Sequence, residues 1–261
     1  MTHLVLDIGN FRVKGAFFEQ GQMTHRFVFP SDNLPLDALK SIFKSRPFQH
    51  CLIASVNSPT GQKIKTLFSE EKWPFKTLNF KEIKAKLEVD QPEELGLDRI
   101  ANVYGALYHF PQNDCIVVDI GTVVTFDFIR MEGSYTGGAI YPGPQLCAKA
   151  LSEFTNKLPL APFVKPPEPI AKSTVTHIQS GLYWGLLGAI ERIVDEMRLE
   201  TPAPSTIKVL ATGGKTRPDE ASIDPSHNAF IEDLKELVDL IDPDITLRGL
   251  HEILNELKKG V

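Results

Sequence analysis

"LVLDIGN", residues 4–10, joins an apolar run to Asp-x-Gly-Asn, and "IVVDIGT", residues 116–122, repeats the pattern with Asp-x-Gly-Thr. Each apolar run predicts a buried strand, and each Asp-x-Gly predicts a sharp turn at its end. Glycine lets main-chain N–H groups approach an anion, and the neighbouring carboxylate can bind a metal ion. A single Asp-x-Gly favours an ordinary turn. Two such motifs, each at the end of an equivalent apolar run, predict paired phosphate-binding turns that face each other across a cleft and hold a polyphosphate with its Mg²⁺.

The repeat continues beyond the two turns. Residues 11–30 and 123–142 each contain two apolar runs divided by a glycine-containing turn, which predicts a second and a third strand in both halves. Both halves then alternate helical and strand patterns. The expected helices are 35–45, 59–70, 92–108, 143–155, 176–198, 227–235 and 245–258, and the expected strands are 51–56, 74–78, 207–212 and 237–241.

These patterns predict the α/β fold class. Three antiparallel strands followed by alternating helices and strands indicate a mixed five-stranded sheet with flanking helices, and the pattern occurs twice. The predicted domains, related by internal duplication, are residues 1–114 and 115–261.

The composition excludes several classes of protein. The chain has 261 residues, of which 42% are hydrophobic and 23% charged, as in ordinary globular proteins. The net charge of -5 and the lack of a Lys/Arg cluster give no reason to expect nucleic acid, so the expected substrate is small. Cys51, Cys115 and Cys147 lack metal-ligand spacing, and the sequence has neither a basic leader nor a long apolar run. We therefore expect a reduced, cytoplasmic protein with no membrane partner.

Six phrases carry a resemblance to a known family. They are "DIGNFRVK" at 7–14, "PEELGLDRIAN" at 92–102, "VVDIGTVVTFD" at 117–127, "GGAIYPG" at 137–143, "STVTHIQSG" at 173–181 and "ATGG" at 211–214. In order and spacing they resemble the type III pantothenate kinases, which are members of the acetate and sugar kinase, Hsp70 and actin superfamily. The resemblance implies two ribonuclease-H-like (actin-like ATPase) domains. It further implies a homodimeric transferase that uses ATP to convert pantothenate to 4'-phosphopantothenate, the first step of coenzyme A biosynthesis.

The resemblance also assigns roles to residues. It makes Asp98 the general base that takes the proton of the substrate's primary hydroxyl, and Asp119 a contributor to a monovalent cation site for K⁺ or NH₄⁺. ATP, bound with Mg²⁺, is expected to contact Asp7, Ile8, Gly9, Asn10, Phe11, Arg12, Val13, Lys14 and Thr122. Pantothenate is expected to contact Gly96, Leu97, Asp98, Arg99 and Thr174.

Without the resemblance, several of these residues have an equally good structural interpretation. Asp98 begins an apolar helical pattern, so it could instead cap the helix or interact with its dipole, and Thr174 could be the N-cap of the next helix. "ATGG" could be a plain strand-to-helix turn. Gly181, Gly185 and Gly188 share one helix face, which would let another backbone, including a partner subunit's, pack closely.

The sequence departs from the family pattern at two places. Phe11 replaces the usual Thr or Ser after Asp-x-Gly-Asn, and a phenyl ring cannot donate a hydrogen bond to phosphate. We expect weaker ATP binding, by about 1 to 3 kcal/mol, and not loss of activity. The segment "LEVDQPEE", residues 87–94, lacks the tyrosine that some relatives have near the substrate. The alternative function is a non-catalytic or regulatory relative, and a nucleotide-switched assembly protein is disfavoured because the chain has little room for inserted subdomains.

Overall fold

The computed structural model describes residues 1–261 except 57, 202, 204–205, 218–224 and 260–261. The chain forms two compact units. The first unit contains Met1–Pro111 together with Ile245–Val261, and the second unit contains Gln112–Asp244. Each unit is built around one five-stranded sheet.

The first unit has a sheet with the strand order β3-β2-β1-β4-β5. Strands β1, β2 and β3 are antiparallel neighbours, whereas β4 and β5 run parallel to β1. The strands are β1 (Thr2–Ile8), β2 (Arg12–Glu19), β3 (Gln22–Pro30), β4 (His50–Ser55) and β5 (Lys76–Thr77). The helices are α1 (Leu36–Ser45), α2 (Ser58–Glu70), α3 (Leu97–His109) and α7 (Ile245–Lys259), with short 3₁₀ helices η1 (Phe80–Glu82) and η2 (Pro92–Glu94).

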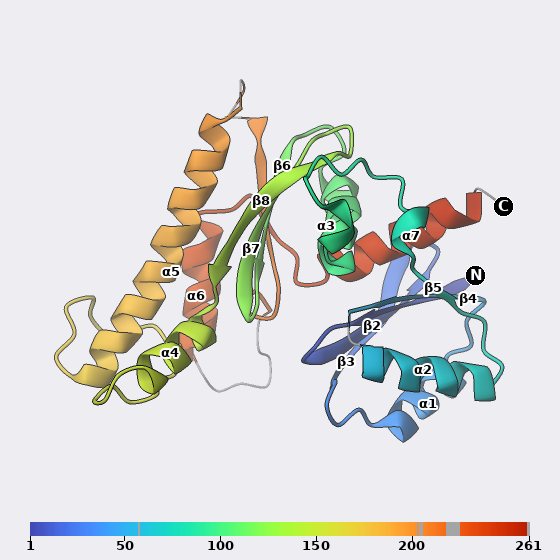
Figure 1. Ribbon diagram of the computed structural model, residues 1–261, viewed down its shortest axis with the longest axis horizontal. Coiled ribbons are helices and arrows are strands. Elements are labelled where there is room, and N and C mark those ends of the chain that lie inside the picture. The colour runs from blue at the N-terminus through green and yellow to red at the C-terminus, as the bar shows by residue number, and fades with distance from the viewer. Residues whose placement is uncertain (57, 202, 204–205, 218–224, 260–261) are drawn as a thin grey trace. The chain divides into compact units, whose positions relative to one another are not determined.

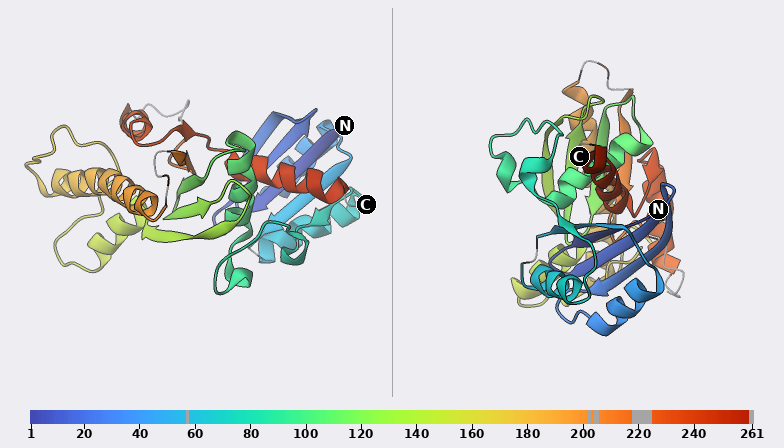
Figure 2. Two further views of the ribbon diagram at one scale, coloured as in Figure 1. Left: turned by 90° about the horizontal axis from the view of Figure 1, so that it is seen from above. Right: turned by 90° about the vertical axis from the view of Figure 1, so that its right-hand side faces the viewer.

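Both faces of strand β1 are buried, because side chains alternate across a strand. Leu4, Leu6 and Ile8 pack in one apolar cluster with residues of α1 and α2. Val5 packs on the other face, in a cluster that includes residues of α3 and α7. Helices α1 and α2 therefore cover one face of this sheet while α3 and α7 cover the other (Figures 1 and 2). Asp7 shares the face of Val5, so its carboxylate belongs to the side covered by α3 and α7.

The second unit repeats this arrangement, with the strand order β10-β9-β6-β7-β8. Its strands are β6 (Cys115–Ile120), β7 (Val123–Ile129), β8 (Tyr135–Pro142), β9 (Lys208–Thr212) and β10 (Leu240–Ile241). Its helices are α4 (Pro144–Glu153), α5 (Thr174–Leu199) and α6 (Pro225–Lys235). Ile116, Val118 and Ile120 pack in the apolar cluster formed with α5 and α6. Asp119 alternates with these residues, so it lies on the opposite face.

The predicted fold class is confirmed: each unit is a mixed five-stranded sheet with flanking helices. The predicted strands 74–78 and 237–241 are shorter than expected, with two residues each in β5 and β10. The expected helix 92–108 divides into η2 and α3, which are separated by Leu95 and Gly96. Pro92 begins the short 3₁₀ turn, and the break leaves Asp98 in the first turn of a separate helix.

The last helix, α7, packs in the first unit and not in the second, where the repeat places it. The predicted domain division assigns α7 to residues 115–261, but α7 packs with the first unit. Leu247, Leu250 and Leu254 of α7 enter the cluster that contains Val5. Helix α3 approaches α7 closely, since a Cβ on Gly249 would lie only 1.8 Å from the Ala101 carbonyl oxygen. Apolar spacing predicts that a helix covers a sheet, and it leaves open which of two similar sheets the helix covers.

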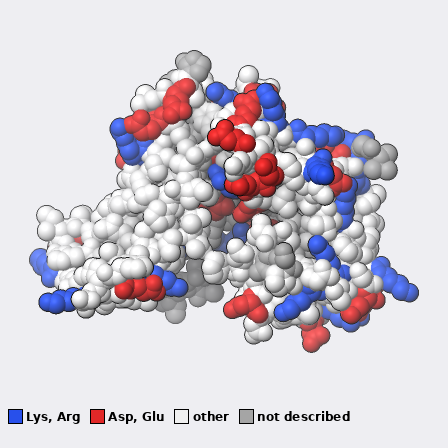
Figure 3. Space-filling model, in the orientation of Figure 1, with Lys and Arg blue, Asp and Glu red and all other residues white. Residues whose placement is uncertain are grey.

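The charged side chains and the cysteines bear on the expectations from the composition. On the face drawn in Figure 3, acidic and basic side chains are interspersed. Within the described part of the chain, no helix has the length and apolarity needed to cross a membrane. Cys51 and Cys115 are buried, Cys147 is half-buried, and all three thiols are free.

Candidate active site

The first Asp turn follows β1. The Gly9 N–H donates to the Arg12 carbonyl at 3.0 Å, which closes the turn between β1 and β2. Asp7 lies directly opposite Lys14 in the β1–β2 register, and their side chains form an ion pair with a distance of 3.5 Å between Nζ and Oδ2. Phe11 is 70% exposed, so the ring contributes little to the core of this unit.

Asp7 and Asp98 are brought together within the first unit. Burial raises the pKa of Asp7, the Lys14 ammonium opposes that rise, and the negative charge of Asp98 adds to it. A carboxylate influences another in this way only when the two are close. The structure thus places the Asp7–Lys14 pair on the sheet face covered by α3, the helix that carries Asp98, which lies far from both in the sequence.

Asp98 is the second residue of helix α3. The N-cap residue is Gly96, so the interpretation of Asp98 as the N-cap is wrong, although the acidic group does lie in the first turn, where the helix dipole favours it. Its Oδ1 accepts a hydrogen bond of 2.9 Å from the Arg99 N–H. Gly96 permits this position, because a Cβ there would lie 2.3 Å from the same Oδ1. Asp98 is half-buried, so part of the residue remains accessible to solvent.

The second Asp turn follows β6 in the second unit. Asp119 is flanked by Thr125 of β7 and Thr212 of β9 in the sheet register. The Gly121 N–H donates to the Val123 carbonyl at 3.0 Å, and Thr122 is exposed.

Two glycine turns pack against this second Asp turn. A Cβ on Gly143 would lie 2.4 Å from the carbonyl oxygens of Gly121 and Thr122, and one on Gly213 would lie 2.4 Å from Oδ1 of Asp119. Gly213 also has a φ of +101°, which most side chains disfavour. The "ATGG" turn therefore does more than link β9 to the next helix: its first glycine allows the chain to approach the Asp119 carboxylate.

Thr174 is the first residue of α5 and is exposed. The N-cap is Ser173, whose hydroxyl accepts from the Thr176 N–H while the Thr176 hydroxyl accepts from the Ser173 N–H. The expectation that Thr174 itself caps the helix is therefore wrong. Its hydroxyl is left outside the capping box.

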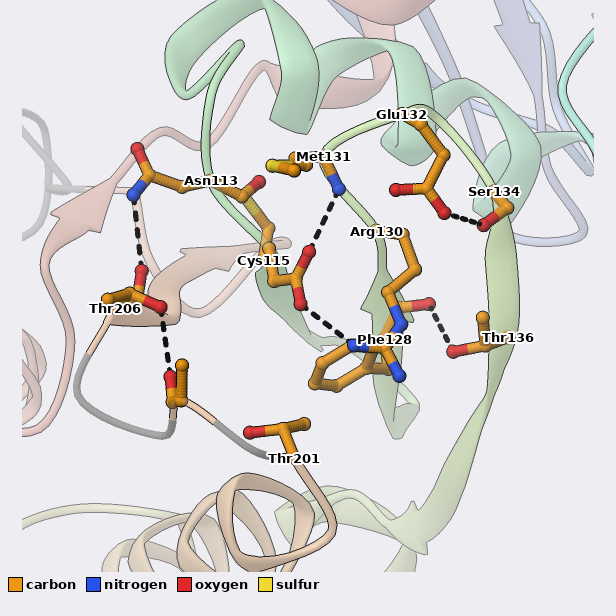
Figure 4. A network of polar contacts seen from close by, with 12 residues as sticks. Asn113, Cys115, Phe128, Arg130, Met131, Glu132, Ser134, Thr136, Thr201 and Thr206 are labelled. Atoms are coloured by element: carbon orange, nitrogen blue, oxygen red, sulfur yellow. Dashed lines mark hydrogen bonds and ion pairs between the residues drawn. The ribbon is translucent and has the colours of Figure 1, made fainter.

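Two cavities of the second unit lie away from the predicted site residues. A cavity of about 400 Å³ lies in the second unit between β7, β8 and the C-terminal half of α5, and its lining includes Phe128, Arg130 and Thr201 (Figure 4). None of the predicted ATP, substrate or cation residues lines it. Arg130 is already paired with Asp114 at 2.9 Å, so this cavity is not an obvious anion site.

Two buried hydroxyl groups near the first Asp turn were not predicted from the sequence. Ser31 is 1% exposed and Thr60 is 4% exposed, and they connect the turn to the end of β3 and the start of α2. No local pattern marks them, because each acts through residues that are distant in the sequence.

The fold defines the class of protein. It is the actin-like ATPase fold, with one ribonuclease-H-like sheet in each unit. A solved structure with this fold is the activator of the 2-hydroxyisocaproyl-CoA dehydratase from Clostridium difficile with bound ADPNP. It has a TM-score of 0.53 and 11% sequence identity, and the match covers 100% of this chain and 97% of that one. Identity this low shows the shared fold alone.

Sequence comparison identifies the family. The profile of the type III pantothenate kinases matches residues 3–196. Type III pantothenate kinases from Legionella pneumophila and Syntrophotalea carbinolica are each 32% identical to this chain. The match to the Legionella enzyme covers 95% of this chain and 96% of that relative, and the match to the Syntrophotalea enzyme covers 98% and 99%. The enzyme of that name from Dehalococcoides mccartyi is 38% identical over 64% of this chain, and the match spans 59% of that relative. The chain belongs to the type III pantothenate kinase family.

Proposed function

We propose that this protein transfers the γ-phosphoryl group of ATP to the primary hydroxyl of pantothenate, giving 4'-phosphopantothenate and ADP. The observation that carries the proposal is the Asp7–Lys14 ion pair on the sheet face covered by the helix that begins with Asp98 in its first turn, in a chain that belongs to this family. The reaction needs a group that orients the attacking hydroxyl and groups that bind the phosphates, and the three side chains have these chemical properties.

Asp98 is proposed as the general base. The substrate oxygen forms a bond to the γ-phosphorus while the bond to the leaving ADP oxygen breaks, and the hydroxyl proton passes to Asp98. The Arg99 N–H holds one carboxylate oxygen at 2.9 Å, which fixes the orientation of the other. The Arg99 side chain and the exposed Thr174 hydroxyl are proposed to bind pantothenate, with Gly96 and Leu97 beside them.

The donor atoms fit the proposed metal ions. Mg²⁺ and K⁺ both favour oxygen ligands, and Asp7 and Asp119 supply carboxylate oxygens at the two Asp turns. Lys14 offsets only part of the rise that burial causes in the pKa of Asp7, so a further cation near this carboxylate is favourable. We propose that Asp7 takes part in binding MgATP and that Asp119 contributes to the K⁺ or NH₄⁺ site. When bound, such ions neutralise negative charge on the phosphates.

A homodimer is proposed from the exposed face of α5. Gly181, Gly185 and Gly188 lie on that face, and a Cβ on any of them would meet no described atom within 4 Å beyond the adjacent backbone of the helix itself. Trp184 lies among them and is 38% exposed. An aromatic side chain on a glycine-lined face can be buried by a second helix that approaches closely. We also propose a cytoplasmic location, where coenzyme A precursors and ATP are available.

The purified protein tests the proposal directly. ADP release should depend on both ATP and pantothenate, and the product should carry one added phosphoryl group by mass spectrometry. Asp98→Asn should keep ATP binding and lose about 10²- to 10⁴-fold in kcat, because a general base is removed. ADP release that ignores pantothenate would contradict the assignment. Absence of turnover would support the regulatory alternative, which the intact Asp7, Lys14 and Asp98 cluster disfavours.

A further inference from the structure

Ser31 connects the end of β3 to the first Asp turn. Its hydroxyl donates to the Gly9 carbonyl at 2.8 Å, and its N–H donates to the Phe11 carbonyl at 3.0 Å. Its own carbonyl accepts from the Thr60 hydroxyl at 3.1 Å. The residue is 1% exposed; its bond with Thr60 is buried, and its hydroxyl bond to Gly9 is partly buried. The Ser31 hydroxyl thus holds the Gly9 carbonyl and the Ser31 N–H holds the Phe11 carbonyl, while Thr60 of helix α2 holds the main chain of Ser31.

The direction of these bonds determines which way the turn presents its N–H groups. The C=O and the following N–H of a trans peptide point in opposite directions. When the Gly9 and Phe11 carbonyls are held by Ser31, the N–H groups of Asn10 and Arg12 are directed to the other side of their peptide planes. Main-chain N–H groups that point to the same side of a glycine-containing turn favour phosphate oxygens.

Phe11 increases the importance of this arrangement. Its side chain offers no hydrogen-bond donor, so at that position only the main chain can donate to a phosphate. The orientation of the peptide units then determines how well the turn binds an anion.

We propose that Ser31 is a positioning residue for ATP binding: its hydroxyl and N–H, on a main chain held by Thr60, orient the main-chain N–H groups of Asn10 and Arg12 toward the phosphates. The inference rests on the proposed function, because it takes the first Asp turn as the ATP phosphate loop. It adds a role for two residues that contact neither the substrate nor the reacting atoms.

The first test compares Ser31→Ala with a matched variant. Ser134→Ala removes another buried serine hydroxyl, which donates to Glu132 at 2.9 Å in the β7–β8 turn of the second unit (Figure 4). Ser31→Ala should raise both the Kd and the KM for ATP about five- to tenfold, since one buried hydrogen bond that orients the site is lost. Its KM for pantothenate should stay within about twofold of the wild-type value, as should both constants for ATP in Ser134→Ala.

Thr60 provides a second, milder test. Thr60→Val has nearly the same shape without the hydroxyl, whereas Thr60→Ser keeps it. Thr60→Val should raise the Kd for ATP about two- to fivefold and Thr60→Ser should restore it, which a purely structural role for the side-chain volume would not produce. This pair decides the question if Ser31→Ala proves too unstable to purify.

Calorimetric titration with ATP separates this inference from the proposed function. Wild-type ATP affinity in Ser31→Ala, or in Thr60→Val where Ser31→Ala does not fold, overturns the role of Ser31. An equal rise in the KM for pantothenate overturns it as well, because the effect would then be general. If the wild-type protein binds ATP but does not phosphorylate pantothenate, the proposed function is contradicted. The ATP titrations of the Ser31 and Thr60 variants still test the role of Ser31 in that case.

Discussion

Gly96→Ala should impair catalysis while leaving the fold almost unchanged. The backbone at Gly96 has φ −59° and ψ 141°, which alanine adopts without strain. The added Cβ would lie 2.3 Å from Oδ1 of Asp98, whereas carbon and oxygen normally approach to about 3.3 Å. The carboxylate must therefore move by about 1 Å, and a displacement of that size at a reacting group can cost about 100-fold in rate. We expect kcat to fall about 10- to 100-fold, with a change in unfolding free energy within about 1 kcal/mol.

A double-mutant cycle isolates the cause of that loss. Steady-state kinetics of Gly96→Ala, Asp98→Asn and the double variant would be compared, with urea denaturation of each. If alanine acts by displacing the Asp98 carboxylate, it should add little to the effect of Asp98→Asn. Normal kcat in Gly96→Ala, or two losses that simply multiply, would refute the reasoning.

Three further predictions concern the first unit. Phe11→Thr should lower the KM for ATP about five- to tenfold by restoring a hydroxyl, and an unchanged KM would argue against a missing hydrogen bond. Lys14→Met should raise the pKa of Asp7 further, so the acid limb of the pH–rate profile should move to higher pH; an unmoved limb would exclude this coupling. Burial, with Lys258 nearby, lowers the pKa of His3 from 6.5 to about 4, so the folded state disfavours protonated His3. The free energy of unfolding should therefore be unaffected by His3 protonation above about pH 6.5 and should fall as the pH drops from there toward 4. Urea unfolding should show up to about 2 kcal/mol of this loss in the wild type and less in His3→Phe, after allowance for solvent screening.

The duplicated α/β fold could be predicted because its signals are local. An apolar run followed by Asp-x-Gly defines a strand and its turn from a few neighbouring residues, and β1 and β6 begin the two sheets as expected. Helix boundaries were harder to predict: the expected helix 92–108 is interrupted at Leu95 and Gly96, where the backbone leaves the helical conformation and Gly96 becomes the N-cap of α3, although the apolar periodicity runs on.

Identifying the residues of the candidate site required both the sequence motifs and the folded structure. The motif order supplied Asp7, Lys14 and Asp98, but only the folded first unit shows that their charges interact. Thr174 illustrates the opposite case, since the sequence allowed it to be the N-cap and the capping box is formed by Ser173 and Thr176. Neighbouring hydroxyl residues are equivalent in a pattern, and only the backbone geometry selects one of them.

By itself, the sequence determined the two repeated turns, the alternation of buried strands and helices, and the family to which the chain belongs. Each depends on residue order over short distances. Tertiary structure alone decided that α7 packs with the first unit and that Ser31 and Thr60 hold the first Asp turn. These are contacts between residues far apart in the chain, where complementary shape and buried hydrogen bonds select the partner and no local pattern records it.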